Sequence, residues 1–203
     1  MQIQITTLSH KFNKSVLFRN LNFSASSPDL IIVKGKNGSG KSTFLRIVSG
    51  FIFPTSGSVS FHPVSLTLLN RHEWIGYCSP SINLYGELSG IENLELANKL
   101  RNKIHPKFQD WISGCGLSQS DLKKPFKSYS SGMKQRIKIL ASVSHQPELL
   151  LWDEPMNNLD RSGKDWVGSI LNDIKSSTLI FLASNEEEEI ALSEKHIDLD
   201  MFK

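Results

Sequence analysis

The sequence predicts an α/β fold in which a mostly parallel sheet carries a glycine-rich loop, and two stretches support this prediction. Residues 35–43 (GKNGSGKST) follow the apolar run 30–33 and precede residues 44–48, whose apolar side chains have helical spacing. Residues 149–155 (LLLWDEP) form an apolar run that ends in two carboxylates, which is typical of a strand buried on both faces. Further strand and helix patterns alternate along the chain, which favours parallel strands joined by helices.

The stretch 35–43 fits the phosphate-binding pattern G-x-x-x-x-G-K-[ST], and its strand–loop–helix context is the one that this loop requires. Its glycines let backbone N–H groups turn inward toward a polyphosphate, and the following helix begins where an anion is favoured. Lys41 can reach the β- and γ-phosphates, and the Ser42 hydroxyl can ligate the bridging Mg²⁺. The alternative is a glycine-rich turn that merely caps a helix, and background frequencies produce this pattern in roughly one chain in a hundred of this length. The predicted nucleotide-binding residues are Gly35, Asn37, Gly38, Ser39, Gly40, Lys41, Ser42 and Thr43.

Asp153 and Glu154 end the apolar run at a place where ligands bind in open α/β sheets. We expect Asp153 to hold Mg²⁺, directly or through water, and Glu154 to polarise a water that attacks the γ-phosphate. The alternative, a pair of helix-capping acids, is disfavoured by the phosphate-binding loop upstream. The two stretches together predict nucleotide binding and a Mg²⁺-dependent attack of water on the γ-phosphate.

Length and composition limit which other classes of protein the chain can belong to. A chain of 203 residues suits one domain with an inserted or appended lobe. The formal net charge of +3, without a basic block, does not indicate nucleic acid as a partner. Cys78 and Cys115 are the only cysteines and are too far apart for a metal site or a disulfide framework, so reduced thiols in the cytosol are expected. No signal peptide or run of ~18 apolar residues is found, so we expect a soluble protein that can still dock on a membrane partner.

The N-terminal part of the chain predicts an antiparallel β-region. Residues 2–7 alternate polar and apolar, residues 10–15 resemble a turn, and residues 16–24 predict a second and a third short strand. Residues 58–61 predict a strand after the turn at 53–57, and residues 66–69 and 74–78 are two more apolar segments. Phe12 either fills the edge of the core or offers an aromatic platform to a purine ring.

From residue 90 to about 140 the periodicity becomes helical, and Gly114 and Gly116 mark the end of a helix. We expect a helical lobe over about residues 86–140, inserted into the α/β core. Residues 128–136 (SYSSGMKQR) lead into an apolar helix, and their small polar side chains suit either an ordinary N-cap or a second anion site.

The C-terminal part predicts a helix over residues 162–175 and a buried strand over 178–183 that ends at Ser184 and Asn185. Residues 186–189, four consecutive glutamates, predict a solvated first turn of a helix. Residues 196–202 predict a last short strand. The six histidines are scattered without ligand spacing, so we expect them to be structural or superficial.

The order and spacing of these motifs resemble the ATP-binding subunit of ABC transporters over nearly the whole chain. The resemblance rests on GKNGSGKST (the Walker A motif), YSSGMKQR as a variant of the signature sequence, LLLWDEP (the Walker B motif) and NNLD. It implies a P-loop NTPase fold in a single nucleotide-binding domain over residues 1–203. It also implies that Phe12 stacks on adenine with Val16 beside it. The small size and SSGMKQR resemble, more narrowly, the haem-exporter ATPase of cytochrome c maturation and related bacterial ATPases.

The resemblance also implies a mechanism, in which two subunits sandwich two Mg-ATP head to tail. The signature residues that would contact the ATP held by the other subunit are Ser130, Ser131, Gly132 and Met133, and Asp160 would couple the two sites. ATP binding would close the dimer, a homodimer in the simplest case, and hydrolysis at Glu154 would reopen it. This movement would drive a transmembrane permease subunit at the cytoplasmic face of the inner or plasma membrane, through a contact near residues 81–90.

Two positions depart from the family pattern. The family's glutamine after the strand at 75–78, which contacts Mg²⁺ and relays to the membrane domain, aligns with Pro80. Proline cannot ligate through its side chain or donate a backbone bond, although Ser79 or Ser81 could substitute. The family's switch histidine aligns with Asn185, which can donate a hydrogen bond to the γ-phosphate but cannot carry charge or shuttle a proton. We therefore expect hydrolysis to survive through Glu154 but to be slower.

Two other functions compete with transport. One is a soluble ABC-type ATPase that acts on nucleic acid or ribosomes, but the second nucleotide domain, long coiled coil or zinc insert usual in such proteins is not found in the sequence. The other is a regulatory subunit that binds ATP and scarcely hydrolyses it, against which the presence of Lys41, Asp153 and Glu154 argues. The transported substrate and its direction belong to a membrane subunit.

Overall fold

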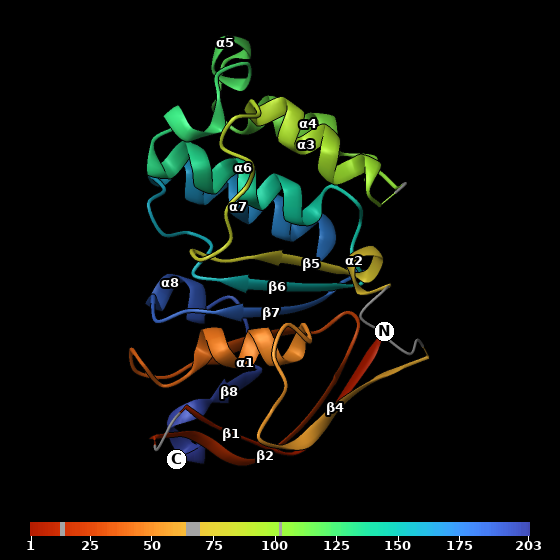
Figure 1. Cartoon of the computed structure of the whole chain (residues 1–203), viewed down its shortest axis with the longest axis vertical. Coiled ribbons are helices and arrows are strands. Elements are labelled where there is room, and N and C mark those ends of the chain that lie inside the picture. Colours follow the sequence, from red (N-terminus) through yellow and green to blue (C-terminus); the bar gives the residue numbers. More distant parts are fainter. Residues whose placement is uncertain (13–14, 64–69, 102) are drawn as a thin grey trace.

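The computed structural model describes residues 1–12, 15–63, 70–101 and 103–203, which form two sheets with helices between and above them (Figure 1). The strands are β1 (Gln2–Phe12), β2 (Ser15–Ser26), β3 (Leu30–Lys34), β4 (Ser56–His62), β5 (Ile75–Cys78), β6 (Leu149–Asp153), β7 (Leu179–Ala183) and β8 (His196–Asp198). The α-helices are α1 (Lys41–Val48), α2 (Arg71–Trp74), α3 (Gly90–Lys99), α4 (Phe108–Gly114), α5 (Gln119–Leu122), α6 (Ser131–Val143), α7 (Arg161–Ile174) and α8 (Glu187–Ile190). Two 3₁₀ turns, η1 (Phe126–Ser128) and η2 (Leu199–Phe202), complete the described elements.

The larger sheet has five strands in the order β5-β6-β7-β3-β8, and its strand pairs are parallel. Successive side chains of β6 enter two different cores. Leu149 and Leu151 pack with α1 and the N-terminal strands, whereas Leu150 and Trp152 pack with α6 and α7. Both faces of the sheet are therefore covered, which explains why the strand is apolar without alternation. The predicted mostly parallel core sheet is confirmed.

The smaller sheet is antiparallel, with the order β2-β1-β4, and α1 lies between it and the parallel sheet (Figure 1). Phe44 of α1 contacts both sheets. Its ring lies 6.2 Å from that of Phe18, in an edge-on arrangement, and 6.2 Å from that of Phe181 of β7. The helix that begins at Lys41 is thus held from two directions by buried aromatic side chains.

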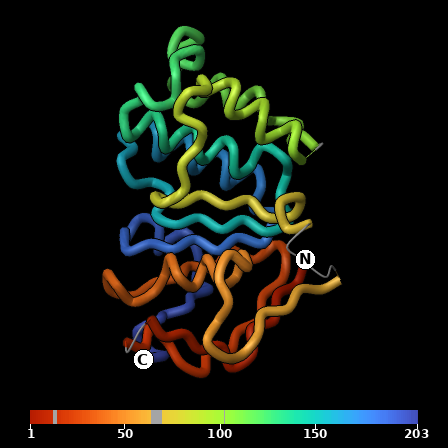
Figure 2. Tube along the Cα trace, viewed as in Figure 1, coloured from red at the N-terminus to blue at the C-terminus, as the bar shows by residue number. Residues whose placement is uncertain are grey.

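The helices of residues 90–143 gather at the end of the molecule that is remote from the antiparallel sheet (Figure 2). Ser89 and Glu92 form a reciprocal capping box at the start of α3. The helix α6 packs both on α3 and on β5, so it joins this helical part to the parallel sheet. The exact extent of an inserted lobe over residues 86–140 stays a prediction.

Several sequence expectations need correction. Residues 16–24 belong to one strand, β2, because register shifts in its pairing with β1 accommodate the polar pair Arg19 and Asn20. Residues 10–12 continue β1 instead of forming a turn. The final strand ends at Asp198, and a 3₁₀ turn follows it. The predicted apolar segment 66–69 lies outside the described residues.

The four glutamates 186–189 are not all solvated. Glu189 is 2% exposed, and its Oε1 accepts a hydrogen bond from the Met156 N–H at 3.2 Å. Burial raises the pKa of Glu189 above its ordinary value. Because α8 folds back over the segment after β6, one carboxylate of this acidic run faces inward and holds that segment.

Candidate functional site

The loop between β3 and α1 curls tightly on itself. Gly35 and Gly40 have φ angles of 146° and 103°, and a Cβ at Gly35 would lie 2.6 Å from the Ser39 hydroxyl oxygen. Such close approach and positive φ require glycine. Ser39 is 1% exposed, and its hydroxyl has no hydrogen-bond partner in the described protein. The loop is therefore a tight cradle that contains one buried polar group without a partner, and such a curled, glycine-rich loop is the form expected of a phosphate site.

Lys41 reaches across this cradle, and its Nζ donates a hydrogen bond to the Gly35 carbonyl oxygen at 2.8 Å. Burial lowers the pKa of Lys41, while the nearby negative charges of Glu154, Asp153 and Asp200 oppose that shift. A buried ammonium attracts an anion more strongly than an exposed one, and the three carboxylates around Lys41 offset part of this attraction. The Lys41 side chain is 6% exposed and lies across the loop, against the Gly35 carbonyl oxygen.

Asp153 ends β6 beside the start of α1 and is 4% exposed. The pKa of Asp153 is raised, mainly by burial and further by the negative charge of Glu154. A side-chain hydrogen bond with Ser42 and the positive charges of Lys41 and Arg46 oppose this shift. The carboxylate and the Ser42 hydroxyl are hard oxygen donors, the type that Mg²⁺ prefers. The residues present therefore fit a magnesium ion that would also be bound by phosphate oxygens.

Glu154 has a φ angle of +51°, which is unusual for a residue with a side chain. Its backbone N–H donates to the Ala183 carbonyl at 2.9 Å, and its Oε2 accepts from Asn157 Nδ2 at 2.5 Å. A strained backbone that is retained by such contacts is common at functional sites. The turn after β6 fixes the direction of this carboxylate.

Asn185 follows β7 and is exposed, and its Nδ2 donates to Asn37 Oδ1 at 2.8 Å. The next residue back, Ser184, bonds through its N–H to the Val33 carbonyl at 3.2 Å. Since β7 lies between β6 and β3, residues at the ends of three neighbouring strands converge on the cradle. The structure brings together the predicted residues Lys41, Ser42, Asp153, Glu154 and Asn185.

Phe12 and Val16 lie at the end of the β1–β2 hairpin, where Phe12 pairs with Ser15 and Val16 pairs with Lys11. The Phe12 side chain is 68% exposed, which argues against the interpretation that it fills the edge of the core. Leu17, the neighbour of Val16, lies against the cradle, because a Cβ at Gly40 would come within 3.2 Å of it. The hairpin end is thus adjacent to the cradle, with an aromatic ring free to stack.

The signature residues lie elsewhere. Ser130 caps α6, and its Oγ accepts from the Met133 N–H at 3.3 Å, while Ser131 is exposed. The helices α1 and α6 pack on opposite faces of the parallel sheet (Figure 1). The α6 helix, which begins at the signature, therefore lies on the other side of the sheet from the helix that begins at the cradle.

The signature helix instead contacts the segment 158–160. A Cβ at Gly132 would lie 2.8 Å from the Asn158 carbonyl oxygen, so this position needs glycine. Arg136 Nη2 binds Asp160 Oδ1 at 2.6 Å, and Asp160 also caps α7 by accepting from the Gly163 N–H at 2.9 Å. That backbone bond, with the smaller effect of the Arg136 charge, holds the pKa of Asp160 below its ordinary value.

Four contacts near the site were missed by sequence reasoning. Gln135 Nε2 donates to the Pro155 carbonyl at 2.8 Å, and Asp200 Oδ2 accepts from the Lys36 N–H at 2.8 Å. Arg46 and Lys138 both bind the loop after β5. Of these residues, only Lys138 could have been singled out from the sequence, because it is a charged residue on the apolar side of a predicted helix.

Within the described ranges, no helix is long and apolar enough to cross a bilayer. Nor does the described part of the chain contain a cluster of three or more His, Cys, Asp or Glu side chains suited to a metal ion. A magnesium ion held by one carboxylate, one hydroxyl and phosphate oxygens needs no such cluster.

A parallel sheet with this loop after β3 and a carboxylate pair at the end of β6 defines a P-loop nucleoside triphosphatase fold. Comparison with known families narrows this class. The ABC transporter family model matches residues 18–157, and the chain belongs to this family. The expected ATP-binding subunit of an ABC transporter, in the class of transport-coupled ATPases, is confirmed at the level of the family.

Curated relatives agree with this assignment. The bacitracin transport ATP-binding protein BcrA of Enterococcus faecalis is 30% identical over 93% of this chain, and the match spans 62% of BcrA's own length. The ergothioneine transport ATP-binding protein EgtV of Helicobacter pylori is 28% identical over 99% of this chain and 98% of its own. The narrower resemblance to the haem-exporter ATPase stays a prediction.

Among solved structures, the dimeric bacterial ABC transporter cassette MJ0796 superposes with a TM-score of 0.85. The match has 20% sequence identity and covers 97% of this chain and 93% of that one. This likeness supports the fold, including the predicted P-loop NTPase architecture.

Asp153→Asn is expected to stabilise the nucleotide-free protein at neutral pH. Because burial raises the folded-state pKa of Asp153, the folded protein holds that proton more tightly than the unfolded chain. Stability is then lost as pH rises from the ordinary value of 3.8 through the raised one. Asparagine carries no charge, so its advantage in melting temperature should be larger at pH 7 than at pH 4 in a thermal-unfolding series.

Asp173→Asn is the matched control, because hydrogen bonds from Lys107 and Trp111 lower the pKa of Asp173. Its carboxylate stabilises the fold above its ordinary pKa, so this variant should lose stability at pH 7. An Asp153→Asn protein that melts below the wild type at pH 7 would show that the buried Asp153 carboxylate does not destabilise the empty site.

Proposed function

We propose that this chain is the subunit that binds and hydrolyses ATP to energise an ABC transporter. The observation that carries the proposal is the convergence of Lys41, Asp153, Glu154 and Asn185 on one glycine-rich cradle. The names of the relatives, which refer to the transport of bacitracin and ergothioneine, support the link to transport.

In the proposed reaction the cradle's N–H groups and Lys41 bind the β- and γ-phosphates of ATP. Lys41 exchanges its bond with the Gly35 carbonyl for bonds to phosphate oxygens. Ser42 and Asp153 would hold Mg²⁺, which when bound would supply positive charge to the phosphate oxygens. Thr43, the residue after Ser42, completes the set of loop residues at the phosphates. Phe12 stacks on the adenine with Val16 beside it.

Glu154 orients and polarises the attacking water as the general base. Asn157, which donates to Glu154 at 2.5 Å, keeps this carboxylate aimed at the water. Asn185 exchanges its bond with Asn37 for a hydrogen bond to the γ-phosphate. Since an amide cannot take up a proton, Asn185 positions the phosphate without assisting proton transfer.

We infer further that two such subunits close head to tail over two Mg-ATP. The N-terminus of α6, with Ser130, Ser131, Gly132 and Met133, would then contact the ATP held by the second subunit. Its placement on the sheet face opposite α1 supports a contact between subunits. Asp160, beside this helix, would couple the two sites across the interface.

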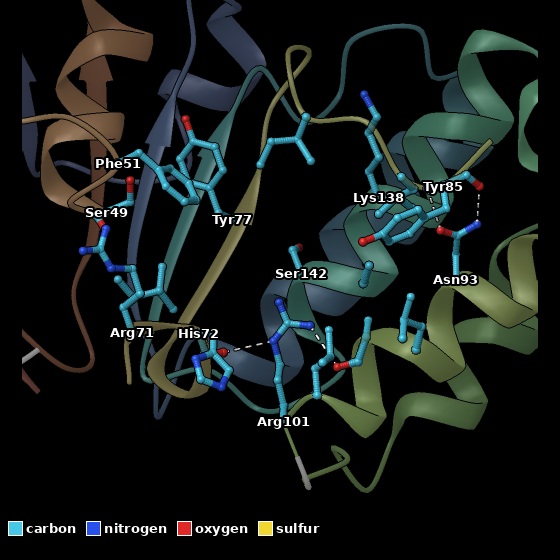
Figure 3. Close-up of a pocket in the computed structure, with 17 residues that line it drawn as sticks. Ser49, Phe51, Arg71, His72, Tyr77, Tyr85, Asn93, Arg101, Lys138 and Ser142 are labelled. Atoms are coloured by element: carbon cyan, nitrogen blue, oxygen red, sulfur yellow. Dashed lines mark hydrogen bonds between the residues drawn. The ribbon is translucent and has the colours of Figure 1, made fainter. Parts of the chain in front are cut away.

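A groove between the parallel sheet and the helical part is the proposed contact for the membrane subunit (Figure 3). It encloses about 260 Å³, and Phe51 and Tyr85 at its rim are 58% and 66% exposed. Buried Asn93 supports the rim by donating to the Tyr85 carbonyl at 3.0 Å and accepting from the Tyr85 N–H at 2.9 Å. Other lining residues are Arg71, Leu96, Leu100, Arg101 and Lys138.

The chemistry of the groove suits one occupant, a short amphipathic helix of a permease that presents an apolar face and an acidic residue. Exposed aromatic rings would bury against the apolar face, and the cations Arg71, Arg101 and Lys138 would favour the acidic side chain. This occupant would hold the subunit peripherally at the cytoplasmic face of the inner or plasma membrane.

Glu154→Gln is expected to bind ATP but lose its turnover, because glutamine cannot accept the proton of the attacking water. Loss of a general base costs about 10²–10⁴-fold in rate. A phosphate-release assay would measure the turnover, and size-exclusion chromatography with Mg-ATP should show the trapped dimer. Turnover retained at the wild-type rate would refute the role of Glu154.

Asn185→His is expected to raise kcat by about tenfold, equivalent to ~1.4 kcal/mol in the barrier. The imidazole can carry charge and shuttle a proton, which the amide cannot. Asn185→Ala is the control, and it should fall below the wild type. A wild type as fast as the histidine variant would show that Asn185 does not limit the rate, whereas a wild type without measurable turnover would favour the regulatory alternative.

Tyr85→Ala is expected to release the membrane subunit while leaving ATP binding intact, since Tyr85 lies on the groove and away from the cradle. The tagged chain would be purified from gently solubilised native membranes and its stoichiometric partners identified. Met201→Ala, an 81% exposed apolar residue outside the groove, is the control and should retain the partner. Ribosomal or DNA-bound partners without a membrane protein would promote the soluble alternative.

A further inference from the structure

The first peptide unit of the cradle, between Gly35 and Lys36, is held at both of its polar ends. Its carbonyl oxygen accepts a hydrogen bond from Lys41 Nζ at 2.8 Å, and its N–H donates to Asp200 Oδ2, also at 2.8 Å. A trans peptide is planar, and its C=O and N–H point in opposite directions. Lys41 and Asp200 therefore lie on opposite sides of this peptide and together fix its orientation.

Asp200 is placed by the strand that pairs with β3. In that pairing Lys34, the residue before the cradle, lies opposite Asp198. Asp198 caps η2 by accepting from the Asp200 N–H at 3.1 Å, and Leu199 between them is fully buried. The backbone that carries the Asp200 carboxylate is therefore anchored beside the strand that leads into the cradle.

The peptide needs such an anchor because a glycine precedes it. Gly35 has a φ angle of 146°, and glycine lets the bonds beside a peptide rotate at little cost. A Cβ at Gly35 would lie 2.6 Å from Ser39 Oγ and 3.5 Å from Asp200 Oδ2, so both side chains lie close to this residue. Asp200 is thus in contact with the cradle, although it has no part in the proposed reaction.

We propose that Asp200 is a positioning residue for ATP, which holds the Gly35–Lys36 peptide so that the cradle and Lys41 are ordered before the nucleotide binds. When Lys41 leaves the Gly35 carbonyl for phosphate oxygens, the bond to Asp200 remains and keeps the start of the loop in place. Groups that are already ordered lose less entropy on binding. The negative charge of Asp200 acts in the opposite sense, because it repels the triphosphate. The acceptor oxygen, and not the charge, is the useful part of this side chain.

The proposal rests on the proposed function of the cradle, and two neutral variants separate the bond from the charge. Asp200→Asn keeps an acceptor oxygen for the Lys36 N–H, whereas Asp200→Ala does not. In calorimetry with Mg²⁺ and a non-hydrolysable ATP analogue, the alanine variant should bind about fivefold more weakly than the asparagine variant. The asparagine variant should bind at least as tightly as the wild type, because it lacks the repelling charge. At saturating ATP the two variants should turn over at the same rate.

Lys203→Gln is the control for the surroundings of Asp200. Lys203 Nζ lies 2.5 Å from Asp200 Oδ1, and both side chains of this ion pair are partly exposed. The variant removes the ion pair but leaves the bond to the Lys36 N–H, so its affinity should stay within about twofold of the wild type. A larger loss of affinity would show that the ion pair, and not the bond to the loop, orders the cradle.

A readout without nucleotide tests the bond itself. In amide NMR spectra of the whole chain, hydrogen exchange of the Lys36 N–H should be about threefold or more faster in Asp200→Ala than in Asp200→Asn. Equal exchange, equal affinity in the two variants, or a loss of kcat in place of affinity would overturn the role of Asp200 and leave the proposed function intact. A wild type that binds no nucleotide would overturn the proposed function and this proposal together.

Discussion

The packing of α1 between the two sheets is the constraint on which the site depends. Phe44 is wedged between Phe18 of the antiparallel sheet and Phe181 of the parallel sheet, and this fixes where the helix begins. Interiors are packed densely enough that such a helix has one position. That position determines where Lys41 and Ser42 stand relative to Asp153, and it directs Arg46 toward Ser81 in the loop after β5. The chemistry of the cradle therefore depends on buried aromatic contacts that take no part in it.

The same architecture delivers Asp153 into a buried place at the end of a strand covered on both faces. Burial of a carboxylate costs stability when the site is empty, as the raised pKa of Asp153 indicates. It also strengthens the attraction between that carboxylate and a cation, because charges interact more strongly away from water. Glu154, with its positive φ, adds backbone strain at the same edge. The empty site is therefore less stable, but Asp153 binds a cation more strongly and the Glu154 carboxylate has a fixed direction. Such a loss of stability is common at functional sites.

The parallel sheet also separates two functions and supplies the links between them. One face holds α1 and the cradle, and the other holds α6 and the signature. Two polar contacts join the faces at the edge of the sheet. Gln135 of α6 bonds to the Pro155 carbonyl just after Glu154. The loop after β5 bonds both to Arg46 of α1 and to Lys138 of α6. Membership of the ABC transporter family gives a reason for such links, because a transport ATPase must pass its nucleotide state to other parts of the molecule.

Local patterns alone determined the fold class, the cradle, the carboxylate pair and the family, because glycine spacing and uninterrupted apolar runs are properties of neighbouring residues. The family pattern, matched residue by residue, also pointed to Asn185, which the structure places against Asn37. Only the tertiary structure could show that Glu189 is buried, that Asp200 binds the N–H of Lys36, and that Arg46 binds Ser81. The bonds that hold these residues span long stretches of chain. Glu189 binds Met156, 33 positions away, Asp200 binds Lys36 across 164 positions, and Arg46 binds Ser81 across 35. Their partners are chosen by how helices and strands pack, and no periodicity of the chain records that choice.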